Sequence, residues 1–353
     1  MDMSVQKFLK RREIAEASRK AIRRFTTDEQ FTYDRATVDS TGVFLVGQLE
    51  RLDQTLNEPL VEFTWSRDIE IRTDVSPADE IASWTNSAFA MSGGINPGGL
   101  NWISNEGNAI AGPSLDIGKT PQPMRLWGAE VKYTVPELVK AQKLGMPVDA
   151  QKVEGMNLKR NMDLDNIVYF GDSTLGFTGL VNSSTIITPS NVANGAAGTP
   201  QWTTKTALEI LKDVNEILTT TWSNSGWKVL PDTLLLPPAQ LGYIASQPVN
   251  TAAQKTILAY IIENNICAQQ GQKLNILPLK WLIGAGVGGT PGTIGNDRMV
   301  AYNKNKKYVQ YPMTELQRTP LEYRSLFQIT TYWARFGQVE FRYNTTLSYR
   351  DNI

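Results

Sequence analysis

The chain has 353 residues, enough for a large core and for roughly two domains. Lysine plus arginine and aspartate plus glutamate both number 35, so no net basic field exists to attract nucleic acid or an anionic membrane. The absence of histidine and the single cysteine exclude Ser-His-Asp, Cys-His and histidine-metal sites and an internal disulfide.

Residues 1–24 form a basic arm with few large apolar side chains. They hold eight basic residues, among them Lys7, Lys10, Arg11 and Arg12, against three acidic ones. Because such a segment buries little apolar surface, we expect it to become ordered only on a partner surface. The start is charged where a secretory signal is apolar, and no apolar run could span a bilayer, so we expect a soluble chain not secreted by that route.

Residues 60–75, LVEFTWSRDIEIRTDV, alternate apolar and polar side chains, which predicts a strand. From 73 to 118 the chain then has no lysine or arginine, five acidic residues including Asp79, Glu80 and Glu106, and clustered glycines. This acidic stretch is too long for an ordinary connection. We expect it to bind something or to form an extended hairpin.

Residues 125–133, RLWGAEVKY, predict another strand, and the strongest helical pattern of the chain follows. Pro136 suits a first helical turn. Gly145 and Pro147 interrupt the pattern, so we expect a short helix and then a long one from about Asp149 to Tyr169.

The corner GDSTLGFT, residues 171–178, is similar to a phosphate-binding loop, but Phe177 occupies the lysine position and the following segment does not favour a helix. We interpret Gly171, Gly176 and Gly179 as turn residues that tolerate positive φ. The acidic residues form no metal-binding spacing. We therefore expect no nucleotide, cofactor or metal.

Residues 183–320 alternate helices and strands, which indicates an α/β unit. The expected elements are a helix over 204–220, a strand over 232–236, a helix containing ILAYIIENN, and strands over 273–277 and 298–302. The Gly-rich run IGAGVGGTPGTIG precedes a strand rather than a helix, so it is no dinucleotide fingerprint. Cys267 ends an apolar helical stretch, where we expect an inert core thiol in a reducing setting.

Residues 325–349 are rich in Val, Thr, Phe, Tyr and Trp and predict long strands. A hairpin alone is marginal in water. We expect these strands to pack on the long helix, which makes a discontinuous domain with 183–320 as an insertion.

This order of parts resembles the major capsid proteins of tailed bacteriophages, which have the HK97-like fold. The resemblance is carried by YTVPELVKAQKLGMPVDAQK, DNIVYFGD and GFTGLVN, and continues through DVNEILTTTW, PDTLLLPP and DRMVAYNKNKKYVQYPM. It implies an α+β fold with an N-terminal arm (1–55), a strand and E-loop hairpin (56–127), a P-domain spine helix and turn (128–182), an inserted α/β A-domain (183–320) and terminal P-domain strands (321–353).

The resemblance also implies a structural function without catalysis. The expected protein forms hexamers and pentamers that close into an icosahedral phage head. It encloses double-stranded DNA without sequence-specific binding, with scaffolding, portal and decoration proteins as further candidate partners. It would be made in the bacterial cytoplasm and end in the virion. The E-loop stretch 73–118 contains no lysine, so we expect no lysine-to-asparagine crosslink there.

Opposite charges suggest how copies align. The acidic loop, with Asp79, Glu80 and Glu106, would face the basic arm, with Lys7, Lys10, Arg11 and Arg12, or the basic segment that begins at Arg125. Arg125 and Glu137 flank the start of the long helix and are further candidate contacts between subunits. Ordinary solvated charge is the competing interpretation for all of them.

Two other functions fit the residues less well. An encapsulin-type bacterial compartment resembles the same fold and would hold protein cargo rather than DNA. A carboxylate-dependent enzyme or a sugar-binding protein needs a deep acidic cleft, for which the sequence offers no support.

Overall fold

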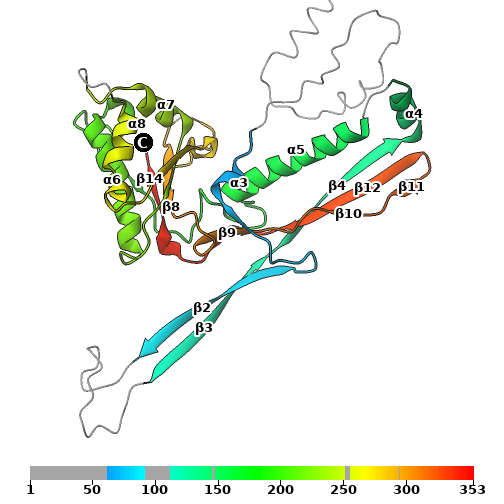
Figure 1. The fold of residues 1–353 in the computed structure, drawn as a ribbon, viewed down its shortest axis with the longest axis horizontal. Helices are drawn as coiled ribbons and strands as arrows, with labels where there is room; N and C mark the ends of the chain where they lie inside the picture. Colours follow the sequence, from blue (N-terminus) through cyan, green and yellow to red (C-terminus); the bar gives the residue numbers. More distant parts are fainter. Residues whose placement is uncertain (1–61, 92–111, 145–147, 251–254, 294) are drawn as a thin grey trace, which may run out of the picture. The chain divides into compact units, whose positions relative to one another are not determined.

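The computed structural model describes residues 62–91, 112–144, 148–250, 255–293 and 295–353 (Figure 1). The chain divides into two units, Met1–Pro59 and Leu60–Ile353, and every described residue lies in the second. Within these ranges no helix is both long and apolar enough to cross a bilayer. The basic arm and Glu106 lie outside the described residues.

The first half of the described chain contains a hairpin, a long strand and two principal helices. Its elements are α3 (Trp65–Asp68), β1 (Glu70–Arg72), β2 (Ile81–Met91), β3 (Pro113–Pro123), β4 (Arg125–Thr134), α4 (Val135–Leu144) and α5 (Val148–Tyr169). β2 and β3 pair along their whole length. β4, α4 and α5 confirm the strand and the interrupted helix expected from the sequence.

The single strand predicted over 60–75 is wrong. A short helical turn, α3, replaces its middle, and within the described part of this range the strand consists of the three residues of β1. The turn buries Trp65 and Asp68. Asp68 accepts a hydrogen bond from the Tyr169 hydroxyl of α5 at 2.5 Å, and the Trp65 N–H donates to Asp165 of α5 at 3.1 Å. These contacts with α5 override an alternation that locally favours a strand.

The second half contains a larger set of helices and strands. They are β5 (Ser190–Asn191), η2 (Trp202–Thr204), α6 (Ala207–Asn224), β6 (Thr233–Leu236), α7 (Pro238–Ser246), α8 (Ile257–Asn264), α9 (Ile266–Gln269), β7 (Asn275–Pro278), η3 (Lys280–Leu282), β8 (Arg298–Tyr302), β9 (Val309–Pro312), β10 (Gln317–Arg318), β11 (Glu322–Arg324), β12 (Phe327–Phe336), β13 (Glu340–Phe341), η4 (Asn344–Thr346) and β14 (Leu347–Asp351).

β12 is the central strand of a sheet that packs on α5 through β4. It pairs antiparallel with β4 over its whole length, beginning with Phe327 opposite Thr134, and its other edge carries β10 and β11. Val131 and Tyr133 of β4 are buried against Met156 of α5. Of the terminal strands expected on the long helix, β12 therefore joins the sheet whose strand β4 packs on α5.

β9 does not belong to the α/β unit in which the 183–320 boundary places it. It pairs parallel with β1 and antiparallel with β13 in a separate three-stranded sheet. Tyr311 of β9 is fully buried in one core with Leu164 and Val168 of α5. The boundary is wrong here because pairing with distant strands, rather than position in the sequence, decides which sheet a strand joins.

β14 is also assigned to the wrong part by the predicted boundaries. Residues 321–353 were expected to form strands on the long helix. β14 lies instead within a five-stranded sheet of order β5-β14-β8-β6-β7. Arg298 of β8 and Asp351 of β14 join the two strands, with Arg298 Nε 2.6 Å from Asp351 Oδ1 and side chains only 6% and 2% exposed. The predicted α/β unit therefore needs the last strand of the chain to complete its sheet.

The five-stranded sheet has a different core on each face. Leu234 and Met299 pack with the buried side of α6 and with α7 and α8. Leu235 and Val300, one residue further along the same strands, join the core that contains α5. Successive side chains of a strand point to opposite faces of the sheet. The sheet therefore packs against α6, α7 and α8 on one face and shares a core with α5 on the other.

Candidate assembly surfaces

The hairpin β2–β3 carries large apolar side chains on an exposed face. Residues two apart on a strand and residues directly paired share a face. The pairs Ile81↔Pro123 and Ser87↔Ile117 therefore place Ile81, Leu115 and Ile117 on the same face of the hairpin, and these side chains are 57%, 52% and 62% exposed. A two-stranded hairpin is marginal in water. This hairpin face is a candidate contact surface.

The root of this hairpin is held by arginines of neighbouring strands. Arg72 of β1 donates to the Ser83 carbonyl at 3.2 Å and to the fully buried Glu340 at 3.0 Å. Arg335 of β12 donates to the Pro77 carbonyl at 2.7 Å. Since these bonds reach both the start of β2 and the loop before it, they fix the direction in which the hairpin leaves the sheet.

The acidic residues predicted at the hairpin have local roles in the structure. Asp79 is exposed, and its carboxylate accepts a hydrogen bond from the Ser76 N–H at 2.7 Å within a turn. Glu80 is exposed and lies 3.9 Å from Arg335. Arg125 is exposed at the first residue of β4. The other predicted contacts, Lys7, Lys10, Arg11, Arg12 and Glu106, lie outside the described residues.

Glu137 is engaged within its own chain. Its carboxylate is 2.7 Å from Lys152 of α5, and Thr134 Oγ1 accepts the Glu137 N–H at 3.2 Å. Partial burial raises the pKa of Glu137, but hydrogen bonds from Lys152 and Thr134 outweigh that effect and hold the pKa below its ordinary value. The spacing Thr-x-x-Glu is a capping-box signal that could have indicated this role from the sequence.

The glycine corner after α5 is shaped by two different requirements. Gly171 (φ 75°) and Gly176 (φ 71°) have left-handed backbones. Gly179 lacks the expected positive φ, but a Cβ there would lie 2.2 Å from the Tyr169 carbonyl oxygen. Phe177, which replaces the phosphate-loop lysine, is buried, and in the described chain no helix opens directly behind the corner. The corner is a tight structural turn.

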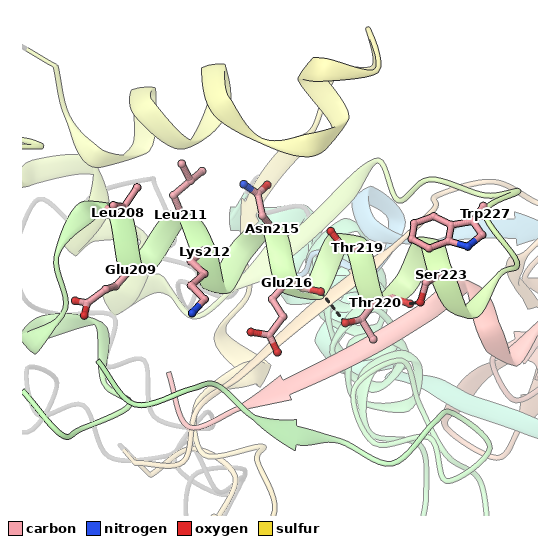
Figure 2. Close-up of a pocket in the computed structure, with 10 residues that line it drawn as sticks. All are labelled: Leu208, Glu209, Leu211, Lys212, Asn215, Glu216, Thr219, Thr220, Ser223 and Trp227. Atoms are coloured by element: carbon pink, nitrogen blue, oxygen red, sulfur yellow. Dashed lines mark hydrogen bonds between the residues drawn. The ribbon is translucent and has the colours of Figure 1, made fainter. Parts of the chain in front are cut away.

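An open groove runs along the outer side of α6. It is lined by Leu208, Glu209, Leu211, Lys212, Asn215, Glu216, Thr219, Thr220, Ser223 and Trp227. In Figure 2, Glu209, Lys212 and Glu216 extend to one side of the helix, and Leu208 extends to the other. Leu208 and Trp227 at the two ends are 66% and 58% exposed. A groove formed by one helix face is a surface feature rather than an enclosed site.

The sequence did not indicate the aromatic end of this groove. Trp227 has a left-handed backbone, with φ 63°, and directly follows Gly226 with φ 67°. Its ring packs edge-on against Trp222 with centroids 4.8 Å apart. The run SNSG before Trp227 signals a helix end, but the exposure of its ring depends on the tertiary structure.

The thiol of Cys267 and the carboxylates of the described residues are candidate reactive or metal-binding groups of this chain. Cys267 is fully buried in α9, and burial raises its pKa to about 11. The apolar stretch before it is two helices, because Asn265 ends α8 and caps α9. Among the described residues, no cluster of three or more cysteine, aspartate and glutamate side chains could hold a metal.

The sequence pattern that defines the major capsid proteins matches residues 98–353. The chain belongs to the major capsid protein family. No curated protein matches it. The fold of this capsid protein is similar to the capsid of Myoviridae phage XM1, with 15% identity and a TM-score of 0.66 over 88% of this chain and 99% of that one.

Further similar structures come from other particles. The capsid of an empty GTA particle has a TM-score of 0.52 at 10% identity, covering 86% of this chain and 94% of that one. A structure from Mycobacterium phage Che8 has a TM-score of 0.51 at 8% identity, covering 87% and 98%. At these identities the likeness is one of fold, and for this capsid protein it extends over most of the chain.

Proposed function

We propose that this capsid protein assembles as hexamers and pentamers into an icosahedral phage head that encloses double-stranded DNA. The observation that carries the proposal is the fold likeness to the phage XM1 capsid, which spans 99% of that chain, in a protein whose family is major capsid protein. The work of such a protein is mechanical, because many copies bury their edges and close a container.

In this proposal the parts of the chain correspond to those of the HK97-like fold. The hairpin β2–β3 is the E-loop, α5 is the spine helix, and β4 with β12 completes the P-domain. The five-stranded sheet with α6 to α9 is the A-domain. The domain boundaries change in one respect, since β9 and β13 belong with the P-domain and β14 with the A-domain.

The hairpin face supports contact with a neighbouring copy. Ile81, Leu115 and Ile117 are exposed in a hairpin that the arginines at its root hold in one direction. A projecting apolar face in a fixed direction suits burial on a second copy. Balanced charge, with 35 basic and 35 acidic residues, suits a container that holds DNA without gripping it.

Imaging the full chain tests this proposal. Light scattering and negative-stain electron microscopy should show capsomers or closed shells, and the nucleic-acid content of shells formed in the host should distinguish a phage head from a protein compartment. Ile117→Glu should prevent assembly while leaving the circular dichroism unchanged. Asn86→Glu, which is exposed on the opposite hairpin face, should assemble normally. A chain that stays monomeric with crowding agents and with the products of neighbouring genes contradicts the proposal.

The charge hypothesis for the basic arm adds a second experiment. Reversal of Lys7, Lys10, Arg11 and Arg12 to glutamate should impair assembly without unfolding the chain, because it removes the attraction to the acidic loop. An unchanged shell yield would show that these charges are only solvated.

A further inference from the structure

The short strand β11 leaves one hydrogen-bonding edge of its sheet open (Figure 1). β11 pairs with β12 through Glu322↔Ile329, Tyr323↔Gln328 and Arg324↔Phe327. On its other side, no strand of the described chain pairs with it. An open edge presents unpaired N–H and C=O groups that can pair with another strand.

The side chains of this edge are exposed and form no internal ion pair. Glu322 and Arg324 are both exposed, and within the described ranges neither has a salt-bridge partner. Tyr323 is 68% exposed. Two charges of opposite sign therefore lie on one face of the strand, and an aromatic ring lies on the other.

The surface beside this edge is apolar. Leu326 and Phe327 are 63% and 44% exposed, and Val135 at the start of α4 is 40% exposed. The Val135 N–H donates to the Leu326 carbonyl at 2.9 Å, so the start of α4 adjoins the turn between β11 and β12. An apolar surface next to an open edge suits burial between proteins better than contact with water.

We propose that β11 of two copies of this chain pair antiparallel across a two-fold axis that passes between their Tyr323 residues. In this register Glu322 lies directly opposite the partner's Arg324, and Arg324 lies opposite the partner's Glu322. Directly opposed side chains of an antiparallel pair share a face, so both ion pairs form on the same side of the joined sheet. The two tyrosines meet on the other side.

Charge complementarity selects the second copy as the occupant and also selects the register. An axis at residue 322 would oppose two glutamates, and an axis at residue 324 would oppose two arginines, both of which are unfavourable. Pro320 has no N–H to donate, and Ser325 has a left-handed backbone with φ 55°, so they limit the pairing to a few residues. Charged residues and prolines at a sheet edge can also serve to prevent unwanted strand pairing. That role does not require the order Glu322, Tyr323, Arg324, in which the strand is complementary to a second copy of itself.

This contact goes beyond the proposed function because it joins rings rather than building them. Neighbours within a ring of five or six copies meet through two different surfaces, whereas a two-fold contact uses the same surface on both copies. A strand of three residues forms a small contact. Such a contact would stabilise a shell because it is repeated between many copies of the chain.

Cysteine crosslinking of the full chain tests the axis. In Tyr323→Cys the two thiols would lie on directly opposed residues, whose Cα atoms are about 4.5–5.5 Å apart, within the range of a disulfide. The native thiol, Cys267, is fully buried. Mild copper-phenanthroline oxidation, which also traps transient encounters, should therefore produce a covalent dimer through residue 323.

Two neighbouring positions provide matched controls. Leu321→Cys and Ser325→Cys alone place their thiols four residues out of register, about 14 Å apart, and should yield at least about ten-fold less dimer. Equal dimer yields from Tyr323→Cys and the two single controls overturn the proposal.

Charge exchange tests the ion pairs independently. Glu322→Arg and Arg324→Glu should each lower the dimer yield of the Tyr323→Cys chain by about ten-fold, because each opposes like charges. Combining the two exchanges restores opposite charges and should restore the yield. A double exchange no better than either single one overturns the proposed register.

These outcomes are distinct from a failure of the proposed function. Shells seen by microscopy without crosslinking at residue 323 would overturn the two-fold contact and leave the shell function standing. Crosslinked dimers in a chain that never forms shells would support the two-fold contact and overturn the shell function. Circular dichroism of each variant shows whether it is folded.

Discussion

Replacing Arg298 by methionine should destabilise the chain strongly, because it leaves the charge of Asp351 buried without a cation. Arg298 Nη2 donates to Asp351 Oδ2 at 2.9 Å, Nη1 donates to the Val181 carbonyl at 2.7 Å, and the guanidinium lies 4.7 Å from the Tyr349 ring centroid. After the substitution, Asp351 keeps the Val287 N–H at 2.9 Å. Removing one partner of a buried pair costs about 3–5 kcal/mol.

The free energy of unfolding can be measured by urea denaturation of the unassembled chain, followed by tryptophan fluorescence. The matched control is Lys255→Met, which breaks an ion pair with Glu263 whose side chains are 60% and 53% exposed. That change should cost no more than about 1 kcal/mol. If Arg298→Met lowered the free energy of unfolding by no more than the control does, the result would refute the claim that this ion pair stabilises the packing of β14 on β8.

A double variant distinguishes the loss of the ion-pair attraction from the cost of leaving Asp351 charged and buried without Arg298. Arg298→Met with Asp351→Leu removes both charges, and an apolar replacement of a buried pair is often tolerated. The double variant should therefore be more stable than Arg298→Met alone. A double variant less stable than the single one would mean that packing around the guanidinium, rather than the charge of Asp351, carries the effect.

Three smaller sets of measurements test other parts of the structure. Gly179→Ala should cost more than about 3 kcal/mol because its Cβ would meet the Tyr169 carbonyl at 2.2 Å, whereas Gly176→Ala, with open space but φ 71°, should cost about 1–2 kcal/mol. Hydrogen bonds from backbone N–H groups lower the pKa of Glu209. Its contribution to the free energy of unfolding is therefore present above the ordinary glutamate pKa and is lost as the pH falls through the lowered pKa. Glu209→Gln should therefore lower the urea midpoint at pH 7 and have little effect near pH 3. An equal effect at both pH values would contradict a stabilising negative charge on Glu209, which accepts the Thr206 N–H at 2.8 Å before the first turn of α6. Burial that raises the pKa of Cys267 to about 11 should make its thiol react with a disulfide reagent only on unfolding, and fast labelling of the folded chain would contradict this.

Local signals account for the parts of the fold that the sequence predicted well. The strand at 298–302 and the pair of helices expected on either side of Gly145 and Pro147 follow from a few neighbouring residues, and the structure has β8, α4 and α5 at these places. The cap at Glu137 was readable in the same way from Thr134, three residues earlier.

The surfaces could not be predicted to the same extent because they depend on pairing between distant strands. Ile81 and Ile117 share a hairpin face only through the register of β2 with β3. The order Glu322, Tyr323, Arg324 is visible in the sequence, but only the position of β11 beside β12 makes it an open edge.

The sequence by itself indicated the family of this protein through its resemblance to known capsid proteins. Composition and short periodic patterns also indicated several of its helices and strands and the lack of histidine chemistry. Only the tertiary structure decided that residues 65–68 turn into a helix on α5, that β9 leaves the α/β unit and that β14 joins it. The physical reason is the same in each case. A strand or turn forms its decisive hydrogen bonds and buried contacts with residues far away in the chain, and a local pattern does not name those partners.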